Sequence, residues 1–319
     1  MISNDVLTTE GFPNCKNGKY YIAVTHNGLF HADDIFAAAL LKLAFGDKII
    51  FKRSRDEVEF EKADIVFDVG KKYDEVKYFD HHQDDYRLIE PTGLKHSALT
   101  LLAKKLIRDK EVLIEFNRRI GYPIAARDNG QELANTISVF YTTPSGWVQY
   151  FNMSWREQEE FNDPNDRYSY FDMAVQTAML IIERVFICII DELNVTDLVR
   201  AYADKAQYNG SIMVIDRYLP FMNTIVKEYK EIKFVIYPNI NTGTFMLQSV
   251  PISLDDKFKN KVLLPKLWRG FKQESWDKPL YDGLDGCIYV HNNGYIGSWD
   301  TVDHAIIAAR NAIMYNEVI

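Results

Sequence analysis

The first half of the chain alternates short apolar runs with longer runs that have helical periodicity. Four short runs are rich in β-branched and aromatic side chains, as buried strands are: 20–24, 49–51, 63–67 and 77–79. Residues 35–45 form a longer run of Ala, Leu, Ile and Phe, which predicts a helix with Asp33 or Asp34 as its N-cap. Another helix is expected after Ser97. Because strands and helices alternate, the pattern predicts an α/β fold with a largely parallel sheet.

The second half of the chain changes pattern twice. Between about residues 157 and 206, apolar side chains recur at spacings of three and four, which predicts a helical connector. After Ser211 the chain returns to β-rich runs: 212–215, 234–237, 245–250 and 287–290. A final helix is expected over about residues 302–314. These elements predict a second, smaller α/β domain in the C-terminal part.

The length and composition agree with a two-domain globular protein. A chain of 319 residues exceeds the usual size of a single core, and its 47% hydrophobic residues can offset the entropy of ordering. The longest apolar stretch, residues 173–190, is interrupted by Gln176, Glu183 and Arg184, so we expect no transmembrane helix. The first twenty residues resemble neither a secretory signal nor a transit peptide. We therefore expect a cytoplasmic protein with no membrane partner.

The net charge and the cysteines narrow the classes of function. A net charge of −8 repels polyanions at long range, which disfavours binding of a nucleic-acid duplex. It disfavours much less a short single strand, or a small phosphate compound, that enters a metal-lined cleft. Cys15, Cys188 and Cys287 have no metal-type spacing, and the apolar surroundings of Cys188 predict that it is buried.

The histidines point to a metal site. Four of the seven fall in two short segments, 26–33 and 80–82, and Asp68 follows another predicted strand. The carboxyl ends of parallel strands meet at one edge of a sheet, where ligands gather. Imidazoles and carboxylates without a thiolate suit Mn²⁺, Mg²⁺ or Zn²⁺. We therefore predict a metal pair at this edge, bridged by Asp68, with Asp128 as a further carboxylate.

Each segment also has an ordinary explanation when it is taken alone. His26 and His31 fit turn or surface positions, and Asp33 or Asp34 fits a helix cap. Asp80-His81-His82 is harder to explain, because adjacent imidazoles beside a carboxylate repel each other when protonated and need partners. Their joint occurrence at one sheet edge favours metal binding.

The order of these motifs resembles that of a known family. The N-terminal motifs are Thr25-His26-Asn27-Gly28-x-Phe30-His31-x-Asp33, Asp68-Val69-Gly70, Asp80-His81-His82-Gln83 and Asp128-Asn129-Gly130. Further motifs lie within residues 151–155, 216–217, 234–237, 264–270 and 290–297. Over about residues 20–315 the chain resembles the melanocyte proliferating gene family, which belongs with the Asp-His-His (DHH) phosphoesterases.

The resemblance implies an organisation and a set of functional residues. It implies a DHH-like catalytic domain at residues 18–150 with two divalent ions, a helical connector at 151–208, and a substrate-binding domain at 209–319 that closes over the cleft. The implied metal ligands are His26, His31, Asp33, Asp68, His81 and Asp128. Asp80 would support the neighbouring imidazole of His81, and His82 would face the phosphate. The implied substrate contacts in the C-terminal domain are Arg269, Gly270, His291 and Gly294.

The chain also departs from the family pattern. The family has Cys-Asp-Glu where this chain has Ala32-Asp33-Asp34, so the role of the last acid is open. A family Asp is replaced by Ala125, and a basic residue that commonly follows His-His-Gln is replaced by Asp84. The six expected ligands are intact, whereas the substrate contacts are in question.

We expect a metal-dependent phosphodiesterase that uses a water activated by two metal ions. Eukaryotic members of the family are described as 3'-to-5' RNA exonucleases, so the resemblance implies single-stranded RNA or short oligonucleotides as substrate, with Mn²⁺ or else Mg²⁺. A small-molecule phosphatase for pyrophosphate or cyclic dinucleotides is the nearest alternative. A metal-binding regulatory protein without catalysis is another. The sequence leaves a homodimer open.

Overall fold

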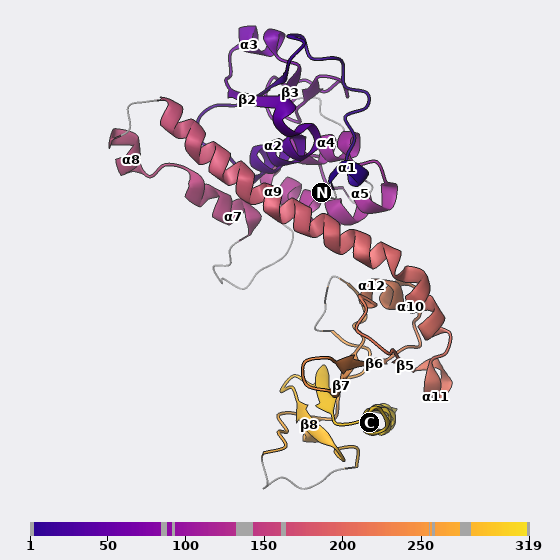
Figure 1. Cartoon of the computed structure of the whole chain (residues 1–319). Coiled ribbons are helices and arrows are strands. Elements are labelled where there is room, and N and C mark those ends of the chain that lie inside the picture. The colour runs from indigo at the N-terminus through magenta and orange to yellow at the C-terminus, as the bar shows by residue number, and fades with distance from the viewer. Residues whose placement is uncertain are drawn as a thin grey trace. The chain divides into compact units, whose positions relative to one another are not determined.

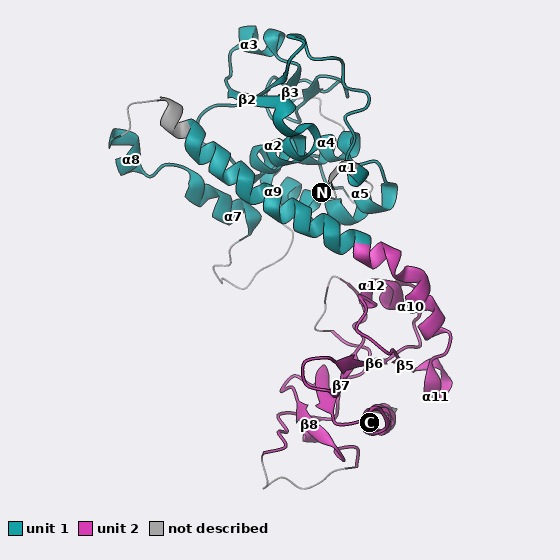
Figure 2. Ribbon diagram, viewed as in Figure 1, with its two compact units in different colours: residues 1–190 teal, residues 191–319 magenta. Residues whose placement is uncertain are grey.

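The structure is a computed structural model. It describes residues 3–83, 88–90, 93–131, 143–160, 164–254, 256, 259–274 and 282–317, so Asp84 lies outside the described residues. The chain divides into two compact units, Met1–Ile190 and Asp191–Ile319 (Figure 2). This boundary falls within residues 151–208, where the sequence predicts a helical connector.

Unit 1 contains a four-stranded parallel sheet (Figure 1). Its strands are β1 Tyr21–Thr25, β2 Ile49–Arg53, β3 Ile65–Phe67 and β4 Tyr78–Phe79. Their order is β2-β1-β3-β4, and Ala23 in the central strand β1 lies opposite both Phe51 of β2 and Ile65 of β3. The central strands are buried, as parallel strands covered on both faces are. The expected strands and the parallel sheet are therefore confirmed.

Most of unit 1 outside the sheet is helical. Its shorter helices are α1 Ser3–Val6, α2 Ala32–Phe45, η1 Gly46–Lys48, α3 Glu57–Lys62, α4 Ala98–Leu106, α5 Lys110–Phe116, η2 Asn117–Gly121, α6 Tyr122–Asp128, α7 Pro144–Val148, η3 Gln149–Phe151 and α8 Trp155–Glu160. Almost every side chain of α2 is buried, and α2 packs against α4. The prediction that Asp33 or Asp34 is the N-cap of α2 was wrong. His31 is the N-cap residue, and Asp34 lies in the first turn, where its Oδ1 accepts the His31 amide at 2.7 Å.

The long helix α9, Pro164–Asn194, crosses the boundary between the units. Within unit 1 it buries one face, which includes Phe171, Ala178, Ile182 and Phe186. Cys188 is exposed, so its expected burial was wrong: it points away from that face. Among the described residues, one segment, Tyr168–Asn194 of this helix, is long and apolar enough to cross a membrane by length and composition alone. The expectation of no such helix is therefore not confirmed, because a few interrupting polar residues leave the segment strongly apolar.

Unit 2 is built on a five-stranded mixed sheet of order β5-β6-β7-β9-β8. Its elements are α10 Thr196–Ala203, α11 Gln207–Gly210, β5 Ile212–Val214, α12 Met222–Glu228, β6 Phe234–Asn239, β7 Thr244–Ser249, η4 Lys266–Trp268, β8 Cys287–Val290, β9 Ile296–Trp299 and α13 Val302–Glu317. Strands β5 and β6 are parallel and the other neighbours are antiparallel. Four buried alanines of α13 belong to the same core as Trp268 and Trp299: Ala305, Ala308, Ala309 and Ala312. The expected strands and final helix are present, and β9 is an additional strand.

Candidate metal centre

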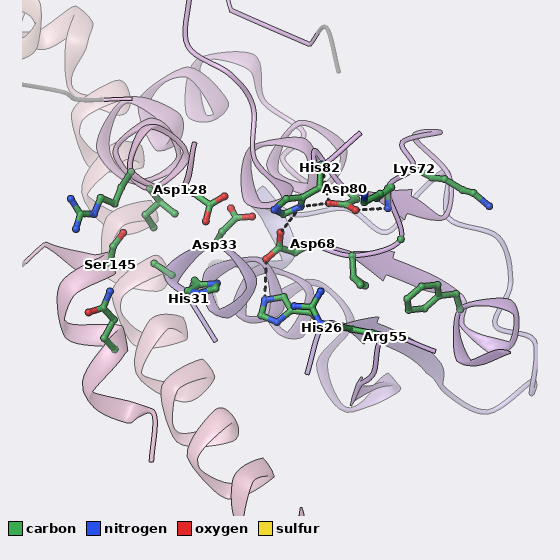
Figure 3. A pocket seen from close by; sticks show the side chains of 18 of the residues that line it. His26, His31, Asp33, Arg55, Asp68, Lys72, Asp80, His82, Asp128 and Ser145 are labelled. Carbon is green, nitrogen blue, oxygen red and sulfur yellow. Dashed lines mark hydrogen bonds and ion pairs between the residues drawn. The ribbon is translucent and has the colours of Figure 1, made fainter. Parts of the chain in front are cut away.

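Three loops at the carboxyl ends of neighbouring strands meet in unit 1. His26 follows β1, Asp68 follows β3, and Asp80 follows β4. The sheet therefore brings together residues that are more than fifty positions apart, as the sequence predicts. They line a cavity of about 780 Å³, into which Asp33 of α2 and Asp128 of α6 also reach (Figure 3).

Asp68 lies at the centre of this arrangement (Figure 3). Its Oδ2 is 3.4 Å from Nε2 of His26, and its Oδ1 is 3.4 Å from Nε2 of His81. The backbone of Asp68 is in the left-handed region, with φ 53°. For a residue other than glycine this conformation costs on the order of 1–3 kcal/mol. The loop thus holds Asp68 in an unfavourable conformation that presents one oxygen to each histidine.

One group of donors surrounds His81. Its Nε2 is 3.1 Å from Asp128 Oδ2 and 3.9 Å from Asp33 Oδ2. Asp33 is held by the first turn of α4, because its two oxygens accept the backbone amides of Ala98 and Leu99 at 2.9 and 3.0 Å. Asp33, His81 and Asp128, with the near oxygen of Asp68, can therefore hold one cation.

The other group surrounds His26. Its Nε2 is 3.5 Å from Asp34 Oδ2, in addition to the contact with Asp68. The ring of His31 lies 5.5 Å from that of His26, centroid to centroid. Asp34 is fully buried and belongs to this group, which the sequence analysis did not predict because a helix cap explained its position. The sequence signal for Asp34 was its position three residues after His31, a predicted metal ligand.

The donors fit a cation better than they fit one another. Asp34 Oδ2 and Asp68 Oδ1 are buried and accept no hydrogen bond. Buried carboxylate oxygens without such partners are costly unless an ion or a proton compensates them. Nitrogen and oxygen donors without thiolate match Mn²⁺, Mg²⁺ or Zn²⁺. The residues present therefore fit the implied pair of divalent ions.

The pKa values of the ligand candidates show an excess of negative charge. Burial lowers the pKa of His81, but the close carboxylates of Asp128, Asp68 and Asp33 raise it to about 11. Burial raises the pKa of Asp34 to about 7, although His26 opposes the shift. Burial and the charges of Asp68 and Asp128 raise the pKa of Asp33 well above its usual value. Without metal, the site therefore retains protons at neutral pH.

Asp80 holds the ring of His82. Its Oδ1 lies 2.7 Å from His82 Nδ1 and accepts the backbone amide of His81 at 2.8 Å. The hydrogen bonds that Asp80 makes here reach the ring of His82 and the backbone of His81, whereas support of the His81 imidazole was expected. The side chain of His82 is 53% exposed, which leaves its other ring nitrogen able to meet a ligand in the cavity.

The loop that carries His26 and His31 is fixed by side chains from elsewhere in the chain. Asn152 accepts the amide of Phe30 at 3.0 Å and donates to its carbonyl at 2.9 Å. Arg53 donates to the carbonyl of Gly28 at 2.8 Å, and its guanidinium lies over the rings of Phe30 and Phe171. Asn152 occurs in a motif of the resemblance, but its role in holding this loop was not predicted from the sequence.

The expected substrate contacts of unit 2 lie near one another. Arg269 Nε donates to the carbonyl of Leu264 at 3.0 Å, and a Cβ on Gly294 would approach that nitrogen to 2.5 Å. Gly270 and His291 line a cavity of about 350 Å³. The structure thus groups Arg269 with Gly294, and Gly270 with His291.

Of the two departures that bear on substrate contacts, Ala125 lies in the described part of the chain. Its side chain is buried in α6, and its carbonyl accepts the backbone amide and the side-chain amide of Asn129, both at 2.9 Å. The backbone of Ala125 therefore positions the residue that follows Asp128.

Comparison with known proteins agrees with the motifs. The model of a family described as Uncharacterised protein family (UPF0160), and named for a MYG1 exonuclease, matches residues 22–313. The chain is 28% identical to a MYG1 protein of Schizosaccharomyces pombe, over 91% of this chain and 96% of that protein. It is 27% identical to the MYG1 exonuclease of Homo sapiens, over 90% of this chain and 84% of that protein. No solved structure is significantly similar to the chain.

Proposed function

Since the chain belongs to the melanocyte proliferating gene (MYG1) family, we propose that it is a metal-dependent phosphodiesterase. The observation that carries this proposal is the position of Asp68, whose two oxygens each face a different group of donors. A carboxylate between two ions is the arrangement that many phosphodiesterases use. Several mammalian relatives are named exonucleases, which supports a nuclease within this class.

Each side chain of the site has a role in the proposed reaction. The residues around His26 (His26, His31, Asp34 and Asp68) would hold one divalent ion, and those around His81 (Asp33, Asp68, His81 and Asp128) would hold the other. When bound, such ions activate a water and neutralise the charge of the phosphoryl group. His82 donates a hydrogen bond to a non-bridging oxygen of the substrate, and Asp80 keeps its ring in the required orientation.

The proposed substrate is single-stranded RNA or a short oligonucleotide, shortened from its 3' end in the cytoplasm. Under this proposal unit 1 is a DHH-like catalytic domain, and unit 2 contributes substrate contacts through Arg269, Gly270, His291 and Gly294. A small-molecule phosphatase, for pyrophosphate or a cyclic dinucleotide, is the second candidate. The net charge of −8 favours it, because a small substrate experiences less long-range repulsion than a strand does.

An assay with purified protein and Mn²⁺ separates these functions. The substrates are end-labelled single-stranded RNA, pyrophosphate and a cyclic dinucleotide, and the variants are His81→Ala and, as control, His304→Ala. His304 is an exposed histidine of unit 2 that pairs with Asp300. We expect stepwise shortening of the RNA by the wild type and the control, and none by His81→Ala. Bound Mn²⁺ without hydrolysis of any substrate would instead identify a metal-binding protein that lacks catalysis.

A further inference from the structure

Four basic side chains line the cavity that contains the metal-ligand candidates: Arg55, Lys71, Lys72 and Arg127. Figure 3 shows Arg55 and Lys72 on the side of His26 and Asp80, away from Asp128 and Ser145. Carboxylates line the same cavity: Asp33, Glu57, Asp68, Asp80 and Asp128. Two bound divalent ions would already balance most of the buried carboxylates, so these cations are available for a ligand.

We propose that Arg55 and Lys71 form a subsite for a second phosphate group of the substrate, next to the phosphate that is hydrolysed. The proposal rests on the proposed function and makes it more specific. A substrate with at least two phosphates, such as a strand or a condensed phosphate, would bind more tightly than one with a single phosphate. Guanidinium and ammonium groups recognise phosphate through charge-assisted hydrogen bonds.

The backbone places both cations beside the site. The amide of Lys71 donates to Asp80 Oδ2 at 2.6 Å, while Oδ1 of the same carboxylate holds His82. The amide of Ser54, directly before Arg55, donates at 2.8 Å to the carbonyl of Thr25, directly before His26. Lys71, and the residue before Arg55, are therefore hydrogen-bonded to segments that carry histidines of the site.

Lys71 also has a backbone conformation that disfavours its side chain. Its φ is 53°, in the left-handed region that glycine adopts without steric cost, and it follows Gly70 in the same strained loop. The side chain is exposed, so burial does not offset this cost. A left-handed backbone at a cation that lines the cavity supports a role of Lys71 in binding.

Within the described part of the chain, neither Arg55 nor Lys71 forms a side-chain hydrogen bond or an ion pair. Lys72 lies over the ring of Tyr78 at 5.2 Å, and we assign it a smaller part. Two acids outside the metal-ligand set, Glu57 and Asp80, line the same cavity. Because the side chains of Arg55 and Lys71 form no ion pair with these acids, their charges are available to an anion.

The test measures binding and does not depend on catalysis. Calorimetry in the presence of Mn²⁺ compares three probes: adenosine 3',5'-bisphosphate, adenosine 5'-monophosphate and pyrophosphate. The proteins are the wild type, the double variant Arg55→Gln/Lys71→Gln, and Lys48→Gln as control. Lys48 is an exposed lysine of unit 1 outside the cavity. Thermal unfolding of each variant verifies that it is folded.

We expect the wild type to bind the probes with two phosphates more tightly than the monophosphate. In the double variant, this ratio of affinities should fall about tenfold. The control keeps the preference. A greater loss for the bisphosphate assigns the subsite to a strand, and a greater loss for pyrophosphate assigns it to condensed phosphates. An unchanged preference, or an equal loss for all three probes, would overturn the subsite. Failure of the proposed function is a separate result, in which the subsite binds but no phosphodiester is hydrolysed.

Discussion

The carboxamide of Asn152 pairs with the backbone of Phe30, which lies 122 positions earlier in the chain. It satisfies both the amide and the carbonyl of Phe30, directly before His31. The next polar group, the amide of His31, is satisfied by Asp34. The loop therefore reaches α2 with its backbone fixed, and the His26 group of donors is arranged before any ion binds.

Asn152→Ala is expected to weaken metal binding at the His26 group. Loss of a residue that orients a ligand typically lowers metal affinity about 10–100-fold. Calorimetric titration with Mn²⁺ should show one of two binding steps weakened. The control is Asn316→Ala, since Asn316 makes a comparable pair of hydrogen bonds to the carbonyls of Leu263 and Ala312 in unit 2. Lowered thermal stability with unchanged metal affinity would show that Asn152 is only structural.

Asp80→Asn is expected to lower kcat about 100-fold or more, by analogy with loss of one oriented hydrogen-bond donor at a reacting group. The negative charge that keeps His82 oriented and able to donate is removed, while the metal ligands remain. Metal content should therefore stay at the wild-type value. Asp300→Asn is the matched control, because Asp300 holds His304 at 2.6 Å on the exposed surface of unit 2. If both variants retain activity, the role of the Asp80–His82 pair is refuted.

Metal binding should release protons at neutral pH. In the metal-free protein at neutral pH, His81 is protonated because its pKa is raised to about 11. Asp34 is partly protonated because its pKa is raised to about 7. The ions require the neutral imidazole and the carboxylate, so affinity for Mn²⁺ should rise with pH between about 6 and 8. Calorimetry in buffers of different ionisation enthalpy should show release of about one proton or more. Metal binding to the His81→Gln variant should release fewer protons.

The same pKa shift determines how the metal-free protein responds to pH. Because folding raises the pKa of His81 above its ordinary value of 6.5, the stabilisation is complete below that value and is lost as the pH rises toward 11. Denaturant unfolding of the metal-free protein should therefore show stability falling with alkaline pH, less so in His81→Gln. Metal affinity that is independent of pH would contradict the protonated site.

The helix α9 is expected to be part of a globular core and not a membrane anchor. Ile182 is fully buried, so Ile182→Ala should lower the free energy of unfolding by about 2–5 kcal/mol. Leu180 on the same helix is 66% exposed, so Leu180→Ala should change the free energy of unfolding by less than about 0.5 kcal/mol. The purified chain should not float with lipid vesicles. Flotation, or equal effects of the two substitutions, would favour a membrane role.

The sequence predicts elements well where one pattern dominates. The strands of unit 1 are short, uniformly apolar and followed by polar residues, so both their type and their common edge could be predicted. Strand β9 was missed because Gly297 and Ser298 interrupt its apolar run, and only pairing with β7 and β8 makes it a strand. Helix α9 illustrates the opposite difficulty, because an apolar helical pattern does not distinguish a core helix from a membrane span.

The candidate site was predicted in its residue types more fully than in its contacts. His26, Asp68, His81 and Asp128 come together as expected, because strand ends and a helix end meet at one edge. The partner of Asp80 could not be read from the sequence, since the turn after β4 decides which of two adjacent rings it faces. The roles of Asp34 and Asn152 depend on contacts that only the folded chain makes.

The central claim is that Asp68 joins two groups of metal ligands into one site. The most direct measurement is the number of Mn²⁺ ions bound per chain by the wild type and by Asp68→Asn, titrated in parallel. We expect two ions for the wild type, and weakened binding of both in the variant, since each group loses an oxygen. A wild type that binds fewer than two ions, or an Asp68→Asn protein that binds two with unchanged affinity, would contradict the account.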